Sequence, residues 1–146
     1  MAAPSERIRD AVEALPLRAG MRVLEIGCGP GAAARLVAER VAPGGFVLAI
    51  DRSAKAVEQC RRGSADEIAA GLLDVRECAV EDLELAPGEA RYDLAFALRV
   101  GAFDGRHPDV GIRALGRVAA ALVPGGRLYI ESANIIRPVD PTRFAG

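Results

Sequence analysis

The sequence predicts an α/β fold: one domain over residues 1–146, built on a doubly wound, mainly parallel sheet of five strands. Short apolar runs alternate five times with helix-like segments, which is typical of parallel strands joined by right-handed crossovers. The run from Phe46 to Ile50 is apolar throughout, as expected of a strand that helices cover on both faces. These two observations predict a Rossmann-like core.

The composition fits a globular protein, with 51% hydrophobic and 27% charged residues. The 19 basic and 20 acidic residues leave a net charge of −1, so the basic surface of a general nucleic-acid binder is not expected. No apolar stretch reaches the roughly 20 residues that cross a bilayer, and the start does not resemble a signal peptide. The three cysteines show no CxxC spacing. We therefore expect a cytoplasmic protein with no membrane partner and no metal site.

The first half of the chain is predicted to form two helices and two strands. A helix opens at Ser5 as its N-cap, with Glu6 in the first turn, and ends before Pro16. The remaining elements are a strand over 22–26, a helix over 31–41 and a strand over 46–50, which ends at Asp51.

The second half continues the alternation. A helical stretch over 53–70 is interrupted at Gly63 and restarts at Ser64, which has capping-box spacing to Glu67. Strands are predicted over 75–80, 92–98 and 127–132, with a helix over 109–122 and a turn at 123–126. The tail over 134–146 contains two prolines and is predicted to be irregular.

The stretch Val23 to Gly31 is the centre of the functional interpretation. It is a buried strand followed by three glycines at alternate positions and an alanine-rich helix. Gly27 and Gly29 have no Cβ, so a ligand can lie against the backbone beside a helix N-terminus. Asp51, at the end of the next strand, is placed to bind the hydroxyls of a ribose. A nicotinamide dinucleotide and another adenosine cofactor both fit this pattern.

At these residues the sequence resembles the class I S-adenosylmethionine-dependent methyltransferases. Their first motif, Glu-x-Gly-x-Gly-x-Gly, is matched by residues 25–31. Tyr92-Asp93-Leu94 is similar to the entry of the family's fourth strand, and Leu122-Val-Pro-Gly-Gly-Arg-Leu128 to the turn into its fifth. The resemblance covers roughly residues 20–132 and implies S-adenosylmethionine as the cofactor, which makes a nicotinamide-binding domain the less favoured alternative.

The resemblance implies a role for individual residues on the cofactor side. Glu25 would anchor the methionine amino group, usually through water, while Gly27, Cys28 and Gly29 would line the methionine and ribose. Asp51 would bind the ribose hydroxyls, with Arg52 beside the adenine. Leu98 and Arg99 would lie near the methionine portion and the transferable methyl group.

One position departs from the family pattern. Where the family often has an acid that accepts a hydrogen bond from the adenine amino group, this chain has Ala79. The backbone of Val80 or the side chain of Glu81 would have to supply that contact.

The acceptor is expected to be a small molecule, because the charge and the scarcity of aromatic residues do not favour a nucleic acid. If the acceptor is a hydroxyl, a general base assists the transfer, and Asp104 and His107 are the candidates. The alternative interpretation of His107 is a turn residue that leads into the next helix.

The short tail after Ser132 leads to two further expectations. The family's C-terminal hairpin is expected to be missing, which would leave the fifth strand as an exposed edge that a second copy of the chain could cover in a homodimer. The chain could also be a truncated or non-catalytic S-adenosylmethionine-binding module rather than an enzyme.

Overall fold

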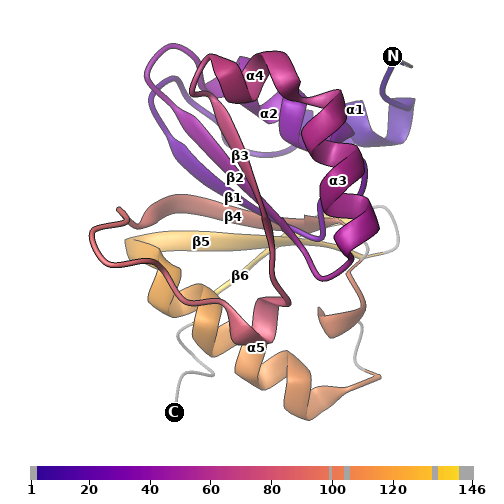
Figure 1. The fold of residues 1–146 in the computed structure, drawn as a ribbon. Helices are drawn as coiled ribbons and strands as arrows, with labels where there is room; N and C mark the ends of the chain where they lie inside the picture. The colour runs from indigo at the N-terminus through magenta and orange to yellow at the C-terminus, as the bar shows by residue number, and fades with distance from the viewer. Residues whose placement is uncertain (1–2, 99, 104–105, 133–134, 142–146) are drawn as a thin grey trace.

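The computed structural model describes residues 3–98, 100–103, 106–132 and 135–141. Its sheet has six strands: β1 (Arg22–Ile26), β2 (Phe46–Asp51), β3 (Leu73–Glu77), β4 (Tyr92–Leu98), β5 (Leu122–Ser132) and β6 (Ile135–Val139). They lie in the order β3-β2-β1-β4-β5-β6, and only the β5–β6 pair is antiparallel (Figure 1). The predicted doubly wound α/β class is confirmed.

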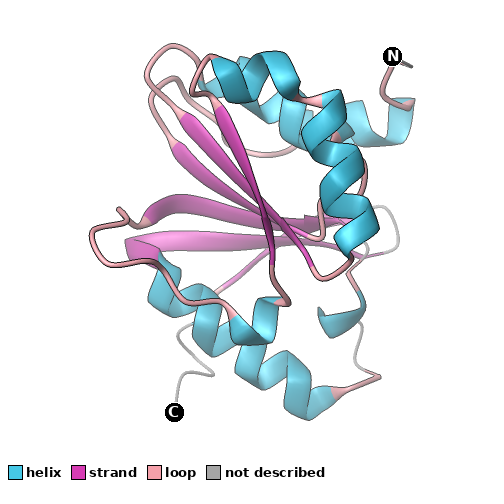
Figure 2. Cartoon of the chain, viewed as in Figure 1, coloured by secondary structure: helices cyan, strands magenta, loops and turns pink. Residues whose placement is uncertain are grey.

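Helices form a layer on each face of the sheet (Figures 1 and 2). One layer contains α1 (Glu6–Glu13), α2 (Ala32–Val41), α3 (Ala54–Gly63) and the short α4 (Ala65–Ala69). The other contains α5 (Pro108–Ala121) and the 3-10 turn η1 (Val80–Asp82); a second 3-10 turn, η2 (Gly101–Phe103), follows β4. Within the described ranges, no helix is long and apolar enough to cross a membrane.

The core has two halves, because neighbouring residues of each central strand point to opposite faces. Val23 and Val47 pack with Val37 of α2 on one face, whereas Leu24 and Leu48 pack with Val118 of α5 on the other. Burial on both faces explains why these strands are apolar without alternation.

Two of the predicted helix starts are confirmed, one of them by a side-chain cap. The Ser5 hydroxyl accepts a hydrogen bond from the backbone N–H of Ile8 (3.3 Å) at the start of α1, and a new helix, α4, follows Ser64. Ser64 does not cap that helix with its side chain; its hydroxyl instead accepts a hydrogen bond from Arg35 Nη1 of α2 (3.0 Å). The buried Ser64 therefore joins two helices rather than closing a capping box.

The C-terminal part of the sheet corrects four predictions: the five strands, the missing C-terminal hairpin, the irregular tail and the exposed fifth strand. β6 pairs with β5 from Leu128↔Val139 to Ser132↔Ile135 and forms an antiparallel hairpin. Pro138 lies within β6, where a proline is tolerated because the strand is at the edge of the sheet. Pro138 therefore does not exclude a strand, and β5 is covered by β6.

Two strand boundaries also differ from the prediction. β3 covers Leu73–Glu77 rather than 75–80, because the chain turns into η1 at Val80. β5 begins at Leu122 rather than at residue 127. The predicted turn at 123–126 is present as an irregularity within β5. Leu122 pairs with Tyr92 and Arg127 pairs with Leu94, so the four residues of the turn lie outside the regular register with β4.

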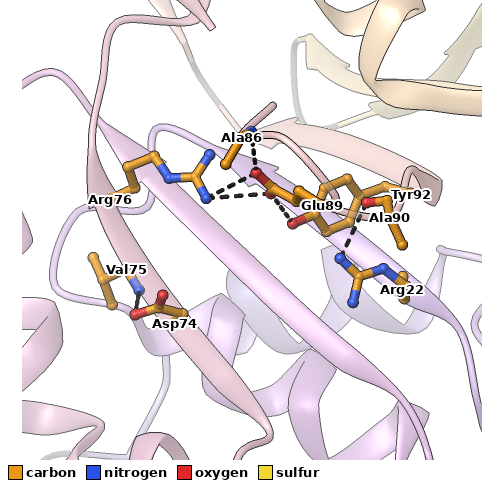
Figure 3. A network of polar contacts seen from close by, with 8 residues as sticks. All are labelled: Arg22, Asp74, Val75, Arg76, Ala86, Glu89, Ala90 and Tyr92. Carbon is orange, nitrogen blue, oxygen red and sulfur yellow. Dashed lines mark hydrogen bonds and ion pairs between the residues drawn. The ribbon is translucent and has the colours of Figure 1, made fainter. Parts of the chain in front are cut away.

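A polar network fixes the loop between η1 and β4 to the sheet (Figure 3). Glu89 accepts hydrogen bonds from the Ala86 backbone N–H (2.8 Å), from the Tyr92 hydroxyl (2.7 Å) and, with both oxygens, from Arg76 Nη2 (3.2 Å). Burial by itself would raise the pKa of Glu89, but these hydrogen bonds and the Arg76 charge together lower it. The Arg22 guanidinium lies over the Tyr92 ring, 4.6 Å from its centroid. These side-chain contacts thus fix the loop, although no α-helix connects β3 to β4 in this described part of the chain.

Candidate cofactor site

A cavity of about 630 Å³ lies at the carboxyl ends of the central strands. The strand order reverses between β1 and β4, which is where open α/β sheets bind ligands. The walls come from the glycine turn, the end of β2, the segment after β3 and the connection from β4 to α5. The lining residues are Ile26, Gly27, Gly29, Ile50, Asp51, Arg52, Cys78, Ala79, Val80, Glu81, Val100, Gly101, Ala102, Arg106, His107 and Val110.

The three glycines of the turn have different functions. All have positive φ angles: 74° at Gly27, 52° at Gly29 and 95° at Gly31. A Cβ at Gly27 would stand 2.7 Å from Val100 Cγ2, and one at Gly31 would stand 2.6 Å from Cys60 Sγ. At Gly29 no atom lies within 4 Å of that position. Gly27 and Gly31 are therefore required by packing, whereas Gly29 faces open space at the cavity.

Hydrogen bonds fix the turn to the end of β2. The backbone N–H groups of Gly27 and Cys28 donate to the Ile50 carbonyl oxygen (2.8 and 3.0 Å). The Gly29 N–H donates to Asp51 Oδ2 (2.9 Å), and the Ser53 N–H donates to Asp51 Oδ1 (2.9 Å). A carboxylate oxygen can accept more than one hydrogen bond, so Asp51 is both held in place and able to accept bonds from a ligand diol.

Glu25 is buried beneath this turn. One of its oxygens, Oε1, is buried without a hydrogen-bond partner among the described residues. Burial raises the pKa of Glu25 well above its ordinary value, nearby Cys60 and Asp51 raise it further, and Arg35 and the Ala34 backbone N–H oppose the shift. An ammonium group or a water bound to it would supply the missing donor. The orphaned oxygen therefore fits the amino group of an S-adenosylmethionine molecule.

The segment after β3 forms the wall next to Asp51. The Cys78 N–H donates to the Asp51 carbonyl oxygen (2.8 Å), which brings Ala79, Val80 and Glu81 to the cavity. Val80 is buried, and Glu81 is the acidic side chain that this segment adds to the lining. The structure thus places an alanine methyl group, not a carboxylate, at position 79 of the wall.

The predicted site residues fall into three groups. Gly27, Gly29, Asp51, Arg52, Val80, Glu81 and His107 line the cavity. Glu25, Cys28 and Leu98 lie outside the lining, with Glu25 and Cys28 buried under or within the turn. Arg99 and Asp104 lie outside the described residues.

His107 is placed at the start of α5, as its N-cap residue. Its side chain does not cap the helix, and the residue lines the cavity together with Val110, one turn further along. The interpretation of His107 as the turn residue before the helix fits this placement, and its role as a base stays a prediction.

The sequence interpretation missed the apolar walls. Ile26 and Ile50 are the last apolar residues of β1 and β2, so the strand ends could have identified them. Val100, Ala102 and Val110 carry no motif, and only the path of the chain from β4 into α5 brings them to the cavity.

Comparison with known proteins points to one family. A family model described as a methyltransferase domain matches residues 23–126. The chain is 38% identical over 130 residues to a trans-aconitate 2-methyltransferase of Paracidovorax citrulli, covering 86% of this chain and 45% of the relative. It is 32% identical over 126 residues to a ubiquinone/menaquinone biosynthesis C-methyltransferase of Bordetella avium, covering 86% and 46%.

A solved structure agrees with these sequence matches. The CcbJ methyltransferase of Streptomyces caelestis superposes with a TM-score of 0.67 at 27% sequence identity. That superposition covers 85% of this chain and 50% of CcbJ. The chain spans half or less of the length of each of these three proteins.

Proposed function

The chain belongs to the family of class I S-adenosylmethionine-dependent methyltransferases, and from this premise we propose that it binds S-adenosylmethionine and transfers its methyl group to a small-molecule acceptor. The observation that carries the proposal is the hydrogen bond between the Gly29 N–H and Asp51 Oδ2. It joins the open side of the glycine turn to the carboxylate that would bind the ribose hydroxyls, at the wall of a cavity of about 630 Å³.

The other residues have proposed roles around that contact. Gly27 and Cys28 form the turn along the methionine and ribose, with Glu25 beneath it near the amino group. Arg52, Val80 and Glu81 would surround the adenine, where the Val80 backbone and Glu81 take the place of an acid at Ala79. Leu98 and Arg99 would lie near the methyl group.

Methyl transfer depends mainly on how the protein positions the donor and the acceptor. When bound, S-adenosylmethionine supplies a methyl group already activated on a sulfonium. The chain's own residues then have to hold the donor, orient the acceptor and exclude water, and such alignment alone accelerates a transfer strongly. If the acceptor is a hydroxyl, we propose that His107 or Asp104 removes its proton.

A small-molecule acceptor is supported by two relatives. Their names refer to trans-aconitate and to ubiquinone and menaquinone biosynthesis. The net charge of −1 gives no electrostatic reason to prefer a nucleic acid.

The proposal is tested by turnover. The purified chain is incubated with S-adenosylmethionine and a panel of carboxylic acids, phenols and quinols, and formation of S-adenosylhomocysteine is measured. We expect product formation that depends on the acceptor. If the acceptor is a hydroxyl, the His107→Gln variant should have a lower kcat. Binding of the donor without turnover on any acceptor would favour the non-catalytic module instead. Binding of NAD, with neither S-adenosylmethionine nor S-adenosylhomocysteine bound, would favour the nicotinamide alternative.

A homodimer remains a separate proposal. Because β6 covers β5, a second copy would have to pair with one of the two edge strands, β3 or β6. Pro138 and Arg137 on β6 disfavour such pairing, because prolines and charges protect edge strands. Size-exclusion chromatography with light scattering distinguishes the states: a dimeric mass supports the proposal, and a monomeric mass at micromolar concentration contradicts it.

A further inference from the structure

Two thiols meet beneath the glycine turn. Cys28 lies in the turn and is 6% exposed, and Cys60 of α3 is fully buried. A Cβ on Gly31 would stand 2.6 Å from Cys60 Sγ, so this sulfur lies directly against the backbone of the turn. The Gly31 N–H donates to the Cys28 carbonyl oxygen (3.0 Å), which holds Cys28 and Gly31 across the same tight turn. Cys28 and Cys60 thus belong to the same buried cluster, and both lie at this turn.

The surroundings of the two sulfurs are unequal. The Ser64 hydroxyl lies 3.9 Å from Cys60 Sγ and also accepts a hydrogen bond from Arg35 Nη1 (3.0 Å). The interaction with Cys28 is the main cause that lowers the pKa of Cys60, to about 7; burial opposes this, while Ser64 and the Arg35 charge assist it. The same interaction, together with burial, raises the pKa of Cys28. The pKa of Cys60 is thus lowered and that of Cys28 raised, so Cys60 is the more acidic of the two thiols.

We propose that Cys28 and Cys60 form an oxidisable dithiol site, which hydrogen peroxide converts into an intramolecular disulfide at the base of the cofactor turn. Cys28 is the member of the pair with residual exposure, 6%, so peroxide would enter the site from its side. A thiolate with a neighbouring thiol is the arrangement that forms disulfides through a sulfenic acid.

The electrons and atoms balance in two steps. The Cys60 sulfur attacks one peroxide oxygen, the O–O bond breaks, and Cys60 becomes a sulfenic acid as one water leaves. The Cys28 sulfur then attacks the Cys60 sulfur, the S–O bond breaks, and the Cys28 proton leaves with the hydroxyl as a second water. Two thiols have lost two electrons, and one peroxide has been reduced to two waters. A thiol reductant such as dithiothreitol reverses the step by exchange.

The disulfide would alter the cofactor turn. In the reduced structure Cys28 Sγ donates to the Gly29 carbonyl oxygen (3.5 Å), and the Gly29 N–H binds Asp51. Joining Cys28 Sγ to Cys60 removes the first contact and pulls the turn toward α3. We expect the oxidised chain to bind S-adenosylmethionine about tenfold more weakly, an expectation that rests on the proposed function. By reciprocity, bound cofactor should slow formation of the disulfide.

The test is a mass measurement on peptides from the full chain. The reduced protein is treated with hydrogen peroxide, unfolded, alkylated and digested. We expect one peptide pair joined through Cys28 and Cys60, lighter by two hydrogen atoms and restored by dithiothreitol, with Cys78 alkylated. Cys28→Ala and Cys60→Ala should each abolish the cross-link, and Cys78→Ala is the matched control that retains it.

Several outcomes overturn the inference. Cys28 and Cys60 both recovered as free thiols after peroxide, both oxidised further without a cross-link, or either cysteine joined to Cys78 would contradict it. A disulfide that leaves cofactor affinity unchanged would contradict its effect on the turn. A reduced chain that forms the disulfide but binds no S-adenosylmethionine would overturn the proposed function and leave the dithiol site standing.

Discussion

The backbone N–H of Gly29 donates a hydrogen bond of 2.9 Å to Asp51 Oδ2. This contact joins the turn after β1 to the end of β2 at the corner of the cavity where we place the ribose. It depends on two properties of the sequence: a residue with a φ of +52° at position 29 and a carboxylate at the end of β2.

Asp51→Asn tests the carboxylate. An amide has one acceptor oxygen, so the variant cannot accept from Gly29 and Ser53 with two oxygens and still present a charged acceptor to a diol. Hydrogen bonds to charged groups contribute about 1.5–3 kcal/mol, so we expect S-adenosylmethionine to bind about tenfold more weakly or worse, measured by equilibrium dialysis.

Asp93→Asn is the matched control for this substitution. Asp93 also accepts a backbone hydrogen bond, from the Arg22 N–H (2.8 Å), but it lies at the opposite end of the strands. An equal loss of cofactor affinity in both variants would show that Asp51 acts through fold stability alone.

Gly29→Ala tests the open side of the turn. The methyl group would occupy the space in which we place the cofactor, and the positive φ adds strain of about 1 kcal/mol. Gly88→Ala carries the same kind of strain, since Gly88 has a φ of 81° and no atom within 4 Å of its Cβ position. We expect similar melting temperatures for the two variants, with cofactor affinity lost only in Gly29→Ala. Retained affinity in Gly29→Ala would contradict the placement.

Glu25→Gln separates stability from binding. The pKa of Glu25 is raised in the folded chain, so the folded state holds the proton more tightly than the unfolded state, and stability falls as the pH rises above the ordinary value of 4.5. Glutamine removes this penalty. In urea unfolding, the variant should therefore have a higher free energy of unfolding than wild type. This difference should be larger at about pH 8 than at about pH 5, by about 1 kcal/mol or more. Cofactor affinity should fall in the same variant.

The exposed Glu13→Gln supplies the comparison for Glu25→Gln. Its side chain is exposed and pairs with Arg40 on the surface, so this substitution should change the free energy of unfolding by less than about 1 kcal/mol. A Glu25→Gln chain that is less stable than wild type at both pH values would contradict the assignment of a buried, poorly compensated carboxyl group.

Glu89→Gln tests the loop network of Figure 3. The pKa of Glu89 is lowered in the folded chain, so its contribution is present above the unfolded value of 4.5 and is lost as the pH falls through the folded value. We expect a loss of about 1–2 kcal/mol at neutral pH that shrinks toward about pH 3. Tyr92→Phe removes one of the same hydrogen bonds and should cost less. A loss that is independent of pH would show that the charge of Glu89 is unimportant.

The fold was predictable where local pattern and long-range packing agree. β1 and β4 have the predicted bounds because buried apolar runs end at clear turn signals. β6 was missed because Pro138 argues locally against a strand, and only pairing with β5 makes an edge position available for it. The continuation of β5 through Val123–Gly126 likewise depends on its register with β4, which no local signal contains.

The site was predictable on the side formed by the glycine turn and the end of β2. Gly27, Gly29 and Asp51 follow from strand ends and turn chemistry, and all three line the cavity. The opposite wall, with Val100 and Val110, depends on how α5 packs against the sheet. The position of Cys60 relative to Cys28 depends on which face of α3 packs against the glycine turn. The sequence pattern of α3 alone does not specify that face.

The most direct test of the central claim is calorimetric titration of the reduced wild-type chain with S-adenosylmethionine, S-adenosylhomocysteine and NAD. The account predicts saturable one-to-one binding of the first two ligands and none of NAD. Absence of binding by both S-adenosyl compounds, in a chain shown to be folded by circular dichroism, would contradict it.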